Sequence, residues 1–244
     1  MLNIVGHRGL PAHYPENTLE GITAALSAGA KGVEIDIQFS KDGEPVLLHD
    51  VSLKRVTGLS GEVSAFDLEL LTKMSAHEPE RFGEAFLPTP IAALQDVVPV
   101  MQSFPKALIF VEIKDDAFMH VSREAVVNKV QSVLADIAEQ VVIISYDLEV
   151  LRLARDATEW PTGWVLTHFN DEQALLAKSF QPEYLICNHQ KLPTDNSPLW
   201  QGLWQWFIYD VTDASLAEQL SARGVNWVES WDVEQLYNAI SEPA

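Results

Sequence analysis

Residues 32–50 read GVEIDIQFSKDGEPVLLHD, and this stretch indicates how the chain folds. It begins as a strand in which apolar and polar residues alternate, so Glu34 and Asp36 lie on the same face. An Asp-Gly pair predicts a tight hairpin turn, after which an apolar run returns to His49. Two carboxylates and a histidine would then share a small volume. Such a group suits a metal site with a general acid or base beside it, although paired acids also occur as the solvated face of a strand.

The composition is that of an ordinary globular chain with a strongly acidic balance. Its 244 residues are 47% hydrophobic and 21% charged, which suits one large domain spanning residues 1–244. The formal net charge of −19 argues against nucleic acid or an anionic membrane as a partner, because both repel an acidic surface. The same charge favours a monomer or a small homo-oligomer.

Three sequence features bear on where the protein resides. No apolar run approaches the ~20 residues that a membrane-spanning helix needs. The first residues lead directly into a short apolar strand, without the basic and long apolar regions of a secretory signal. Cys187 is the only cysteine, so no internal disulfide can form. Together these features predict a cytoplasmic protein.

Strands and helices alternate along most of the chain. A short strand precedes residues 32–50, and a helix between them begins near Asn17 or Thr18 and ends at Gly29. Eight strand–helix units in a chain of this size predict a (β/α)8 TIM barrel, with a doubly wound open sheet as the lesser alternative. The expected strands cover residues 3–6, 32–38, 107–114, 141–145, 162–166, 183–187, 204–209 and 225–229, with helices at 123–139, 171–180, 213–223 and 233–240 and another after Asp147.

Residues 51–88 break this alternation. Glycines, charges and short apolar clusters mix there without a sustained period, so we expect a small insertion at about 51–88, after the second strand. The run Leu87-Pro88-Thr89-Pro90 then predicts the start of the next helix, with Thr89 as its N-cap and Pro90 in its first turn.

Polar residues gather at the ends of the first three expected barrel strands. In a TIM barrel the active site lies at the C-terminal ends of the strands. Carboxylates and cations that converge at one barrel mouth therefore indicate a functional site. The strand-end residues are His7 and Arg8, Glu34 and Asp36, Glu112 and Lys114, then Ser145, Tyr209 and Asp210, while several later strands end in apolar or neutral residues.

Three carboxylates at this mouth could bind a metal ion. Glu34, Asp36 and Glu112 offer hard oxygen ligands, which suit Mg²⁺ or Ca²⁺ better than Zn²⁺. Arg8 and Lys114 supply positive charge near the same point, as a bound oxyanion needs.

Two histidines complete the constellation. His7 and His49 can each exchange a proton near neutral pH, one taking it from a nucleophile and the other giving it to a leaving oxygen. With a metal ion and Arg8 to neutralise phosphate oxygens, this set suits the cleavage of a phosphodiester. Lys114 could instead form a Schiff base, as in barrel aldolases, but Glu112 two residues away would keep it protonated and a poor nucleophile.

The order and spacing of motifs over residues 3–114 resemble the glycerophosphodiester phosphodiesterase family. A serine-aromatic pattern at Ser145-Tyr146 resembles the family more weakly. The stronger motifs are His7-Arg8-Gly9, Pro15-Glu16-Asn17-Thr18, Glu34-x-Asp36, Lys41-Asp42-Gly43-x-Pro45-Val46, His49-Asp50, Arg55-x-Thr57-Gly58 with Gly61, Leu87-Pro88-Thr89 and Glu112-Ile113-Lys114.

The resemblance implies a TIM barrel with an insertion after its second strand, and hydrolysis of a glycerophosphodiester to an alcohol and glycerol 3-phosphate. It implies one divalent cation, Mg²⁺ or Ca²⁺, on the three carboxylates. The nucleophile stays open between water and the substrate's own glycerol hydroxyl. By the same resemblance, the acid–base pair is His7 and His49, and the phosphate ligands are Arg8 and Lys114. The supporting residues are Glu16 and Asn17, and the Asn17 amide could reach the phosphate or a metal-bound water.

The C-terminal part departs from the family pattern. Trp206 is followed later by Val211-Thr212-Asp213 in place of the usual valine-asparagine-aspartate. Residues 224–231 read GVNWVESW in place of the usual glycine-valine-aspartate-glycine run that ends in threonine-aspartate. These changes leave the proposed chemistry intact but concern the pocket for the alcohol or glycerol. Trp206 could cover the glycerol carbons, and a core position would suit it equally.

Two other functions stay open as lesser alternatives. A related phosphodiesterase acting on lysophospholipid head groups would need an apolar lip around the site, which the irregular residues 51–87 do not decide. A barrel that binds a phosphorylated ligand without turnover would have lost acid–base or metal residues, and this chain keeps all the expected ones.

Overall fold

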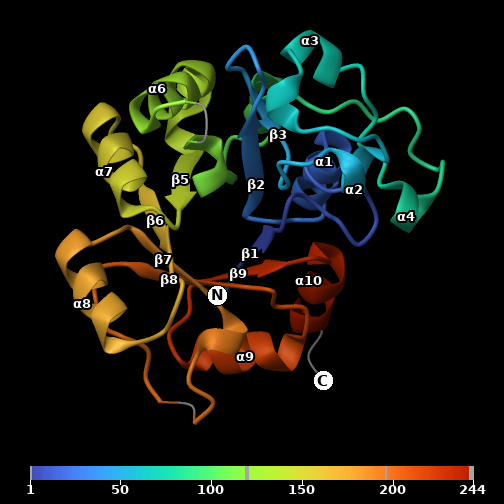
Figure 1. The fold of residues 1–244 in the computed structure, drawn as a ribbon. Helices are drawn as coiled ribbons and strands as arrows, with labels where there is room; N and C mark the ends of the chain where they lie inside the picture. Colours follow the sequence, from blue (N-terminus) through green and yellow to red (C-terminus); the bar gives the residue numbers. More distant parts are fainter. Residues whose placement is uncertain (1, 119–120, 196, 242–244) are drawn as a thin grey trace.

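Eight parallel strands form a closed barrel in the computed structural model, which describes residues 2–118, 121–195 and 197–241. The barrel strands are β1 (Asn3–Gly6), β2 (Gly32–Phe39), β4 (Leu108–Ile113), β5 (Val141–Ser145), β6 (Thr162–Val165), β7 (Tyr184–Asn188), β8 (Gln205–Tyr209) and β9 (Trp227–Ser230). Neighbouring strands follow chain order, and β1 pairs with both β2 and β9, which closes the cylinder. The predicted TIM barrel is therefore confirmed. Figure 1 shows the strands at the centre with helices around them.

The hairpin predicted at residues 32–50 is present. β3 (Pro45–Leu47) pairs antiparallel with the C-terminal part of β2 and lies beside the barrel. The turn has Gly43 at φ 80°, a conformation that glycine adopts without strain. All eight residues of β2 are buried, so Glu34 and Asp36 do not form a solvated face. Two buried carboxylates need hydrogen bonds or cations to offset their desolvation.

Helices cover the barrel between successive strands. Residues 135–139, expected to continue a helix, belong to the 3₁₀ helix η4 (Ala135–Gln140) instead. No helix in the described part of the chain is both long and apolar enough to cross a bilayer. The longer helices are α1 (Leu19–Ser27), α5 (Val97–Ser103), α6 (Arg123–Leu134), α7 (Leu148–Ala157), α8 (Asp171–Phe180), α9 (Ala214–Ala222) and α10 (Val233–Ser241).

Asn170 caps α8 by accepting a hydrogen bond from the Gln173 N–H at 3.0 Å. Replacing Asn170 with alanine should lower the free energy of unfolding by about 1 kcal/mol, because this N–H loses its side-chain partner. Urea denaturation measures the change, with Asn170→Asp as the control that keeps a capping oxygen. An unchanged unfolding midpoint for the alanine variant would show that the cap does not stabilise the protein.

Between β3 and α5 the described chain forms short elements only. In Figure 1 they gather beside β3 on one flank of the barrel. They are α2 (Lys54–Thr57), η1 (Val63–Ala65), α3 (Leu68–Leu71), α4 (Pro79–Phe82) and η2 (Leu94–Asp96). Three of these elements, α2, η1 and α3, share a small apolar core with β3, which includes Val46, Leu53 and Leu71.

The helix start predicted at Thr89 is wrong. Thr89 Oγ1 donates to the Phe86 carbonyl at 2.7 Å, its N–H donates to Ser75 Oγ at 3.0 Å, and Pro90 forms a β-bridge with Ser75. Helical turns begin only at η2. A residue that precedes proline is biased towards extended backbone, and here the pairing with residue 75 makes use of that bias.

Aromatic side chains fill the inside of the barrel. Phe110 meets Tyr184, Phe207 and Trp227 edge-to-face, with ring centroids 5.2, 5.0 and 5.7 Å apart. A second and larger apolar layer lies between the sheet and the helices. The filled interior gives a rigid floor to the cavity at the strand ends.

Candidate active site

A cavity of about 300 Å³ opens where the C-terminal ends of the barrel strands meet. Part of its lining is apolar and comes from β5, β6 and β7, through Ile144, Val165 and Ile186. The rest is polar or aromatic, as expected for the functional end of this fold. These residues are His7, Arg8, Glu34, His49, Glu112, Lys114, Tyr146, Phe207, Tyr209, Asp210, Glu229 and Trp231.

The three carboxylates predicted as metal ligands converge beside this cavity. β2 and β4 pair in a register that sets Asp36 opposite Glu112, and Glu34 lies two residues earlier on the same face of β2. Glu34 and Asp36 are only 4% and 1% exposed. One oxygen from each of the three carboxylates lies within 4.8 Å of the others, so the group could hold a metal ion.

Asp36 is the best compensated of these carboxylates. Arg8 Nε lies 2.9 Å from its Oδ2, and Lys114 Nζ donates to its Oδ1 at 3.2 Å. Asn17 donates to Oδ2 through its Nδ2 and accepts from the Asp36 N–H through its Oδ1, both at 3.1 Å. Burial opposes ionisation, but Arg8 and Lys114 outweigh it and lower the pKa of Asp36 to about 2. Asp36 is therefore ionised at neutral pH.

Three other carboxylates lack this compensation. Burial and repulsion from Asp36 raise the pKa of Glu112 to about 7, and burial raises the pKa of Glu229 to about 8. Burial, with repulsion from Asp36 and Glu229, raises the pKa of Glu34 well above its usual range. Within the described residues, Oε1 of each of these three glutamates has no hydrogen-bond partner. A divalent cation would supply the missing positive charge, so this donor set fits such an ion.

Arg8 and Lys114 place positive charge on the cavity wall. The Arg8 guanidinium also donates to Glu16 through Nη1 at 3.1 Å, and Lys114 Nζ lies 4.0 Å from Glu112. Burial would lower the pKa of Lys114, but Asp36 and Glu112 raise it overall. The amine stays protonated, which makes it a poor nucleophile for a Schiff base and a suitable phosphate ligand.

His7 follows β1 and is packed tightly. Its N–H donates to the Ser230 carbonyl of β9 at 3.1 Å, and its ring meets Trp231 edge-to-face with centroids 5.6 Å apart. Its Nδ1 is buried and has no partner in the part of the chain that the structure describes. Burial, with the charge of Arg8, lowers the pKa of His7 to about 3. The neutral ring can accept a proton or bind a cation.

Hydrogen bonds on the side away from the cavity hold His49 in its orientation. Its Nδ1 lies 2.6 Å from Asp50 Oδ1, and Asp50 Oδ2 accepts a hydrogen bond from Arg55 Nε at 2.7 Å. Gln38 Nε2 donates to the His49 carbonyl at 3.1 Å. The Asp50 carboxylate keeps the hydrogen on Nδ1 and leaves Nε2 of His49 for a ligand in the cavity.

Glu16 and Asn17, predicted as supporting residues, act through other side chains. Glu16 is buried and accepts hydrogen bonds from Arg55 at 2.7 and 2.9 Å as well as from Arg8. Asn17 has φ 55°, and both ends of its amide are engaged by Asp36. In this structure the Asn17 amide therefore holds Asp36 in place.

Trp206 lies away from the cavity. Phe207 and Tyr209 of β8 line the cavity, so Trp206 projects from the opposite face of the strand. Trp206 is 4% exposed, packs against Phe169 and Trp200, and donates through Nε1 to the Trp200 carbonyl at 3.0 Å. The prediction that Trp206 covers glycerol carbons is therefore wrong, and its core alternative holds.

The structure adds residues to the site that the sequence analysis gave no role. Glu229 and Trp231 come from the end of β9, and the Tyr146 and Tyr209 hydroxyls lie 3.2 Å apart at the cavity wall. A lone carboxylate near the end of an otherwise apolar strand was the available signal for Glu229. Ser145, named with the strand ends, is instead fully buried and donates to a main-chain carbonyl of β4.

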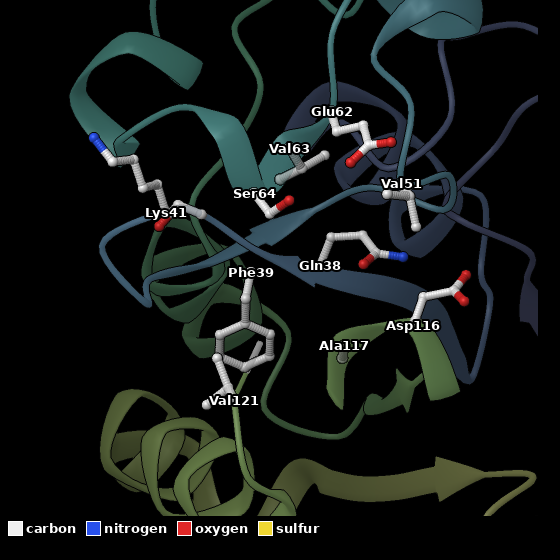
Figure 2. A pocket seen from close by; sticks show the side chains of 11 residues that line it. Gln38, Phe39, Lys41, Val51, Glu62, Val63, Ser64, Asp116, Ala117 and Val121 are labelled. Carbon is white, nitrogen blue, oxygen red and sulfur yellow. The ribbon is translucent and has the colours of Figure 1, made fainter. Parts of the chain in front are cut away.

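A second hollow, of about 100 Å³, lies between β2, the insertion and η3 (Asp115–Phe118). Figure 2 shows Glu62 and Ser64 of the insertion near Gln38 of β2, with Asp116 of η3 beside them. None of the described residues that line this hollow belongs to the predicted site. We assign it to the packing of the insertion against the barrel.

Fold and cavity together define a (β/α)8 barrel with a group of buried carboxylates, cations and histidines at its mouth. The model of the glycerophosphoryl diester phosphodiesterase family matches residues 7–228, so the chain belongs to this family.

Curated relatives and solved structures are similar to this chain. Glycerophosphodiester phosphodiesterase 1 of Homo sapiens is 28% identical over 215 residues, covering 88% of this chain and 58% of that protein. Glycerophosphodiester phosphodiesterase of Caldanaerobacter subterraneus subsp. tengcongensis is 31% identical over 150 residues, covering 61% of this chain and 60% of that protein. The chain thus spans about three fifths of the length of these two relatives.

Two solved structures share the fold. A phosphodiesterase of Oleispira antarctica, in complex with the product sn-glycerol-3-phosphate, has a TM-score of 0.86 at 22% identity and covers 98% of this chain and 97% of its own. Glycerophosphodiester phosphodiesterase of Thermotoga maritima has a TM-score of 0.75 at 23% identity, with 98% of each chain covered.

Proposed function

We propose that this chain hydrolyses glycerophosphodiesters to an alcohol and glycerol 3-phosphate, and that the reaction depends on Mg²⁺ or Ca²⁺. The observation that carries the proposal is a single cavity lined by two histidines, an arginine, a lysine and several carboxylates. Relatives named as glycerophosphodiester phosphodiesterases, and a structural neighbour in complex with sn-glycerol-3-phosphate, support the class of substrate.

Arg8 and Lys114 bind the phosphate in this proposal. Both side chains line the cavity and pair with Asp36 behind it, so their positive charges are held in place before substrate arrives. Fixed charges of this kind stabilise the negative charge that develops on phosphate oxygens without having to rearrange.

Glu34, Asp36 and Glu112 would hold the divalent cation, since their oxygens converge, and Oε1 of both Glu34 and Glu112 has no hydrogen-bond partner among the described residues. Oxygen ligands alone favour Mg²⁺ or Ca²⁺. When bound, the cation neutralises phosphate charge as a Lewis acid.

His7 and His49 carry out the proton transfers. One removes the proton of the attacking oxygen, which belongs to water or to the substrate's glycerol hydroxyl, and the other protonates the departing alcohol oxygen. The 2.6 Å contact between His49 Nδ1 and Asp50 makes Nε2 the nitrogen of His49 that exchanges this proton.

We also propose how the protein is organised and where it works. The chain acts as a single barrel domain with an insertion at about 51–88, as a monomer or small homo-oligomer. A lone cysteine suits a reducing compartment, so we propose the cytoplasm.

Hydrolysis of glycerophosphocholine, with and without EDTA, tests this function. We expect release of glycerol 3-phosphate, its loss on addition of EDTA, and its return on addition of Mg²⁺ or Ca²⁺, because the carboxylate group needs a cation. Absence of release with either metal directs the assay to other glycerophosphodiesters and to lysophospholipids. Absence of hydrolysis of all of these would contradict the proposal in favour of a barrel that binds a phosphorylated ligand without turnover.

A further inference from the structure

We propose that His7, Glu34 and Glu229 form a second cation site, suited to Zn²⁺, that shares Glu34 with the oxygen ligands Glu34, Asp36 and Glu112. The two sites would lie side by side at the mouth of the barrel, with Glu34 as the carboxylate between them. Such a site differs from the first both in its donor atoms and in the cation that it selects.

Three neighbouring strands supply the ligands. β9, β1 and β2 are adjacent in the barrel, and Glu229 is in register with Val5, two residues before His7. One nitrogen of His7 and one oxygen each of Glu34 and Glu229 lie within 4.8 Å of one another. A cation bonded at about 2.0–2.2 Å holds its ligands within about 4 Å of each other, so small side-chain rotations complete the site.

Each of the three side chains has one buried polar atom without a hydrogen-bond partner in the part of the chain that the structure describes, although the other oxygen of Glu34 accepts a hydrogen bond from the Arg8 N–H at 3.1 Å. Among the described residues, His7 Nδ1, Glu34 Oε1 and Glu229 Oε1 are buried without a hydrogen bond. Glu229 is 4% exposed and lines the cavity. The cations of the cavity, Arg8 and Lys114, pair with Asp36 instead. Arg8 is thus shared among several buried carboxylates, and a buried carboxylate oxygen without a hydrogen-bond donor is costly, a cost that a bound cation would remove.

The donor atoms select the metal. One imidazole nitrogen with two carboxylate oxygens matches the three protein ligands of an open Zn²⁺ site, whereas Mg²⁺ prefers oxygen ligands throughout. The group formed by Glu34, Asp36 and Glu112 has oxygen ligands only. The protein would therefore take Zn²⁺ at the histidine-containing site even when Mg²⁺ is abundant.

Zn²⁺ at this site would inhibit the hydrolysis. The cation would occupy a nitrogen of His7, which then cannot exchange a proton with the substrate. It would also compete for Glu34 with the divalent cation at the oxygen site. This consequence rests on the proposed function, whereas the binding of Zn²⁺ does not.

Isothermal titration of the full chain with Zn²⁺, in millimolar Mg²⁺, tests the site. We expect wild type to bind one Zn²⁺ ion at this site. Glu229→Gln should lower the affinity for this ion at least ~10-fold, because a direct ligand is lost. Asp210→Asn removes another carboxylate of the same cavity and should leave this binding unchanged. Glu112→Gln should retain it as well, since Glu112 belongs only to the oxygen site. Circular dichroism checks folding, and His7→Gln serves as the second variant if Glu229→Gln does not fold.

Several outcomes decide between the two proposals. Three results would overturn the second site. In the first, wild type does not bind Zn²⁺. In the second, wild type, Glu229→Gln and His7→Gln bind Zn²⁺ equally, and in the third, binding depends on Glu112 and not on Glu229. Zn²⁺ binding that depends on Glu229 in a protein that hydrolyses nothing would support the site and contradict the hydrolase function. Hydrolysis that continues with Zn²⁺ bound would overturn the inhibition.

Discussion

Replacing His49 with alanine should lower kcat for glycerophosphocholine by about 10³-fold, because general acid–base catalysis typically contributes 10²–10⁴-fold. The side chain lines the cavity, and Asp50 directs its Nε2 towards the ligand space. His7→Ala should have an effect of the same order, since the two proton transfers need two groups. Initial rates of glycerol 3-phosphate release at saturating metal measure both variants.

The control for these variants is His168→Ala. His168 is exposed, bonds to the neighbouring Thr167 and does not line the cavity. Its loss should leave kcat unchanged, and circular dichroism should show the same fold for all three variants. Activity close to wild type in either His7→Ala or His49→Ala would contradict the acid–base assignment.

Replacing Glu112 with alanine should raise the Mg²⁺ or Ca²⁺ concentration needed for half-maximal activity by at least ~10-fold, because changes at a metal site commonly cost 10–100-fold in affinity. Glu112 lies opposite Asp36 across β2 and β4, and its Oε1 has no hydrogen-bond partner among the described residues, with Lys114 Nζ 4.0 Å away. Titration of activity with metal in an EDTA-stripped protein measures the shift.

Glu62→Ala is the matched control for the metal titration. Glu62 is an exposed carboxylate that lines the second hollow and not the active-site cavity, so its loss removes the same charge from elsewhere in the molecule. Its metal requirement should equal that of wild type. An unchanged requirement in Glu112→Ala would remove Glu112 from the set of metal ligands.

The barrel and most of the cavity could be predicted because their signals are local. Alternation along residues 32–38 gave the strand that carries Glu34 and Asp36, and the rule that barrel sites lie at strand ends brought in His7 and Lys114. An Asp-Gly turn gave the hairpin that returns to His49.

Trp206 and Glu229 show where this reasoning fails. Both faces of a barrel strand are buried, so an apolar strand such as β8 does not reveal which of its residues face the interior. The structure shows that Phe207 and Tyr209 face the cavity, and only this three-dimensional information tells which face of β8 points inward. Glu229 is a single carboxylate in a strand that is otherwise mostly apolar, so the sequence pattern does not mark it as a site residue.

The insertion shows a different limit. Thr89 and Pro90 have the composition of a helix start, but their backbone pairs with Ser75. Local sequence patterns do not predict this contact between separate segments. Arg55 is a similar case, since its partners Asp50 and Glu16 lie on other segments of the chain. Long-range pairing of this kind overrides local propensity.

Arg55 makes the site dependent on a part of the molecule that is not barrel. It lies on α2 and holds the carboxylate behind His49 and the carboxylate behind Arg8. The insertion and β3 share a small apolar core, and small units of this kind can open before the whole protein unfolds. Opening of this one segment would remove the hydrogen bonds of Arg55 to both carboxylates, and with them the support of His49 and Arg8. We therefore expect heat to disorder the proposed site before it unfolds the barrel.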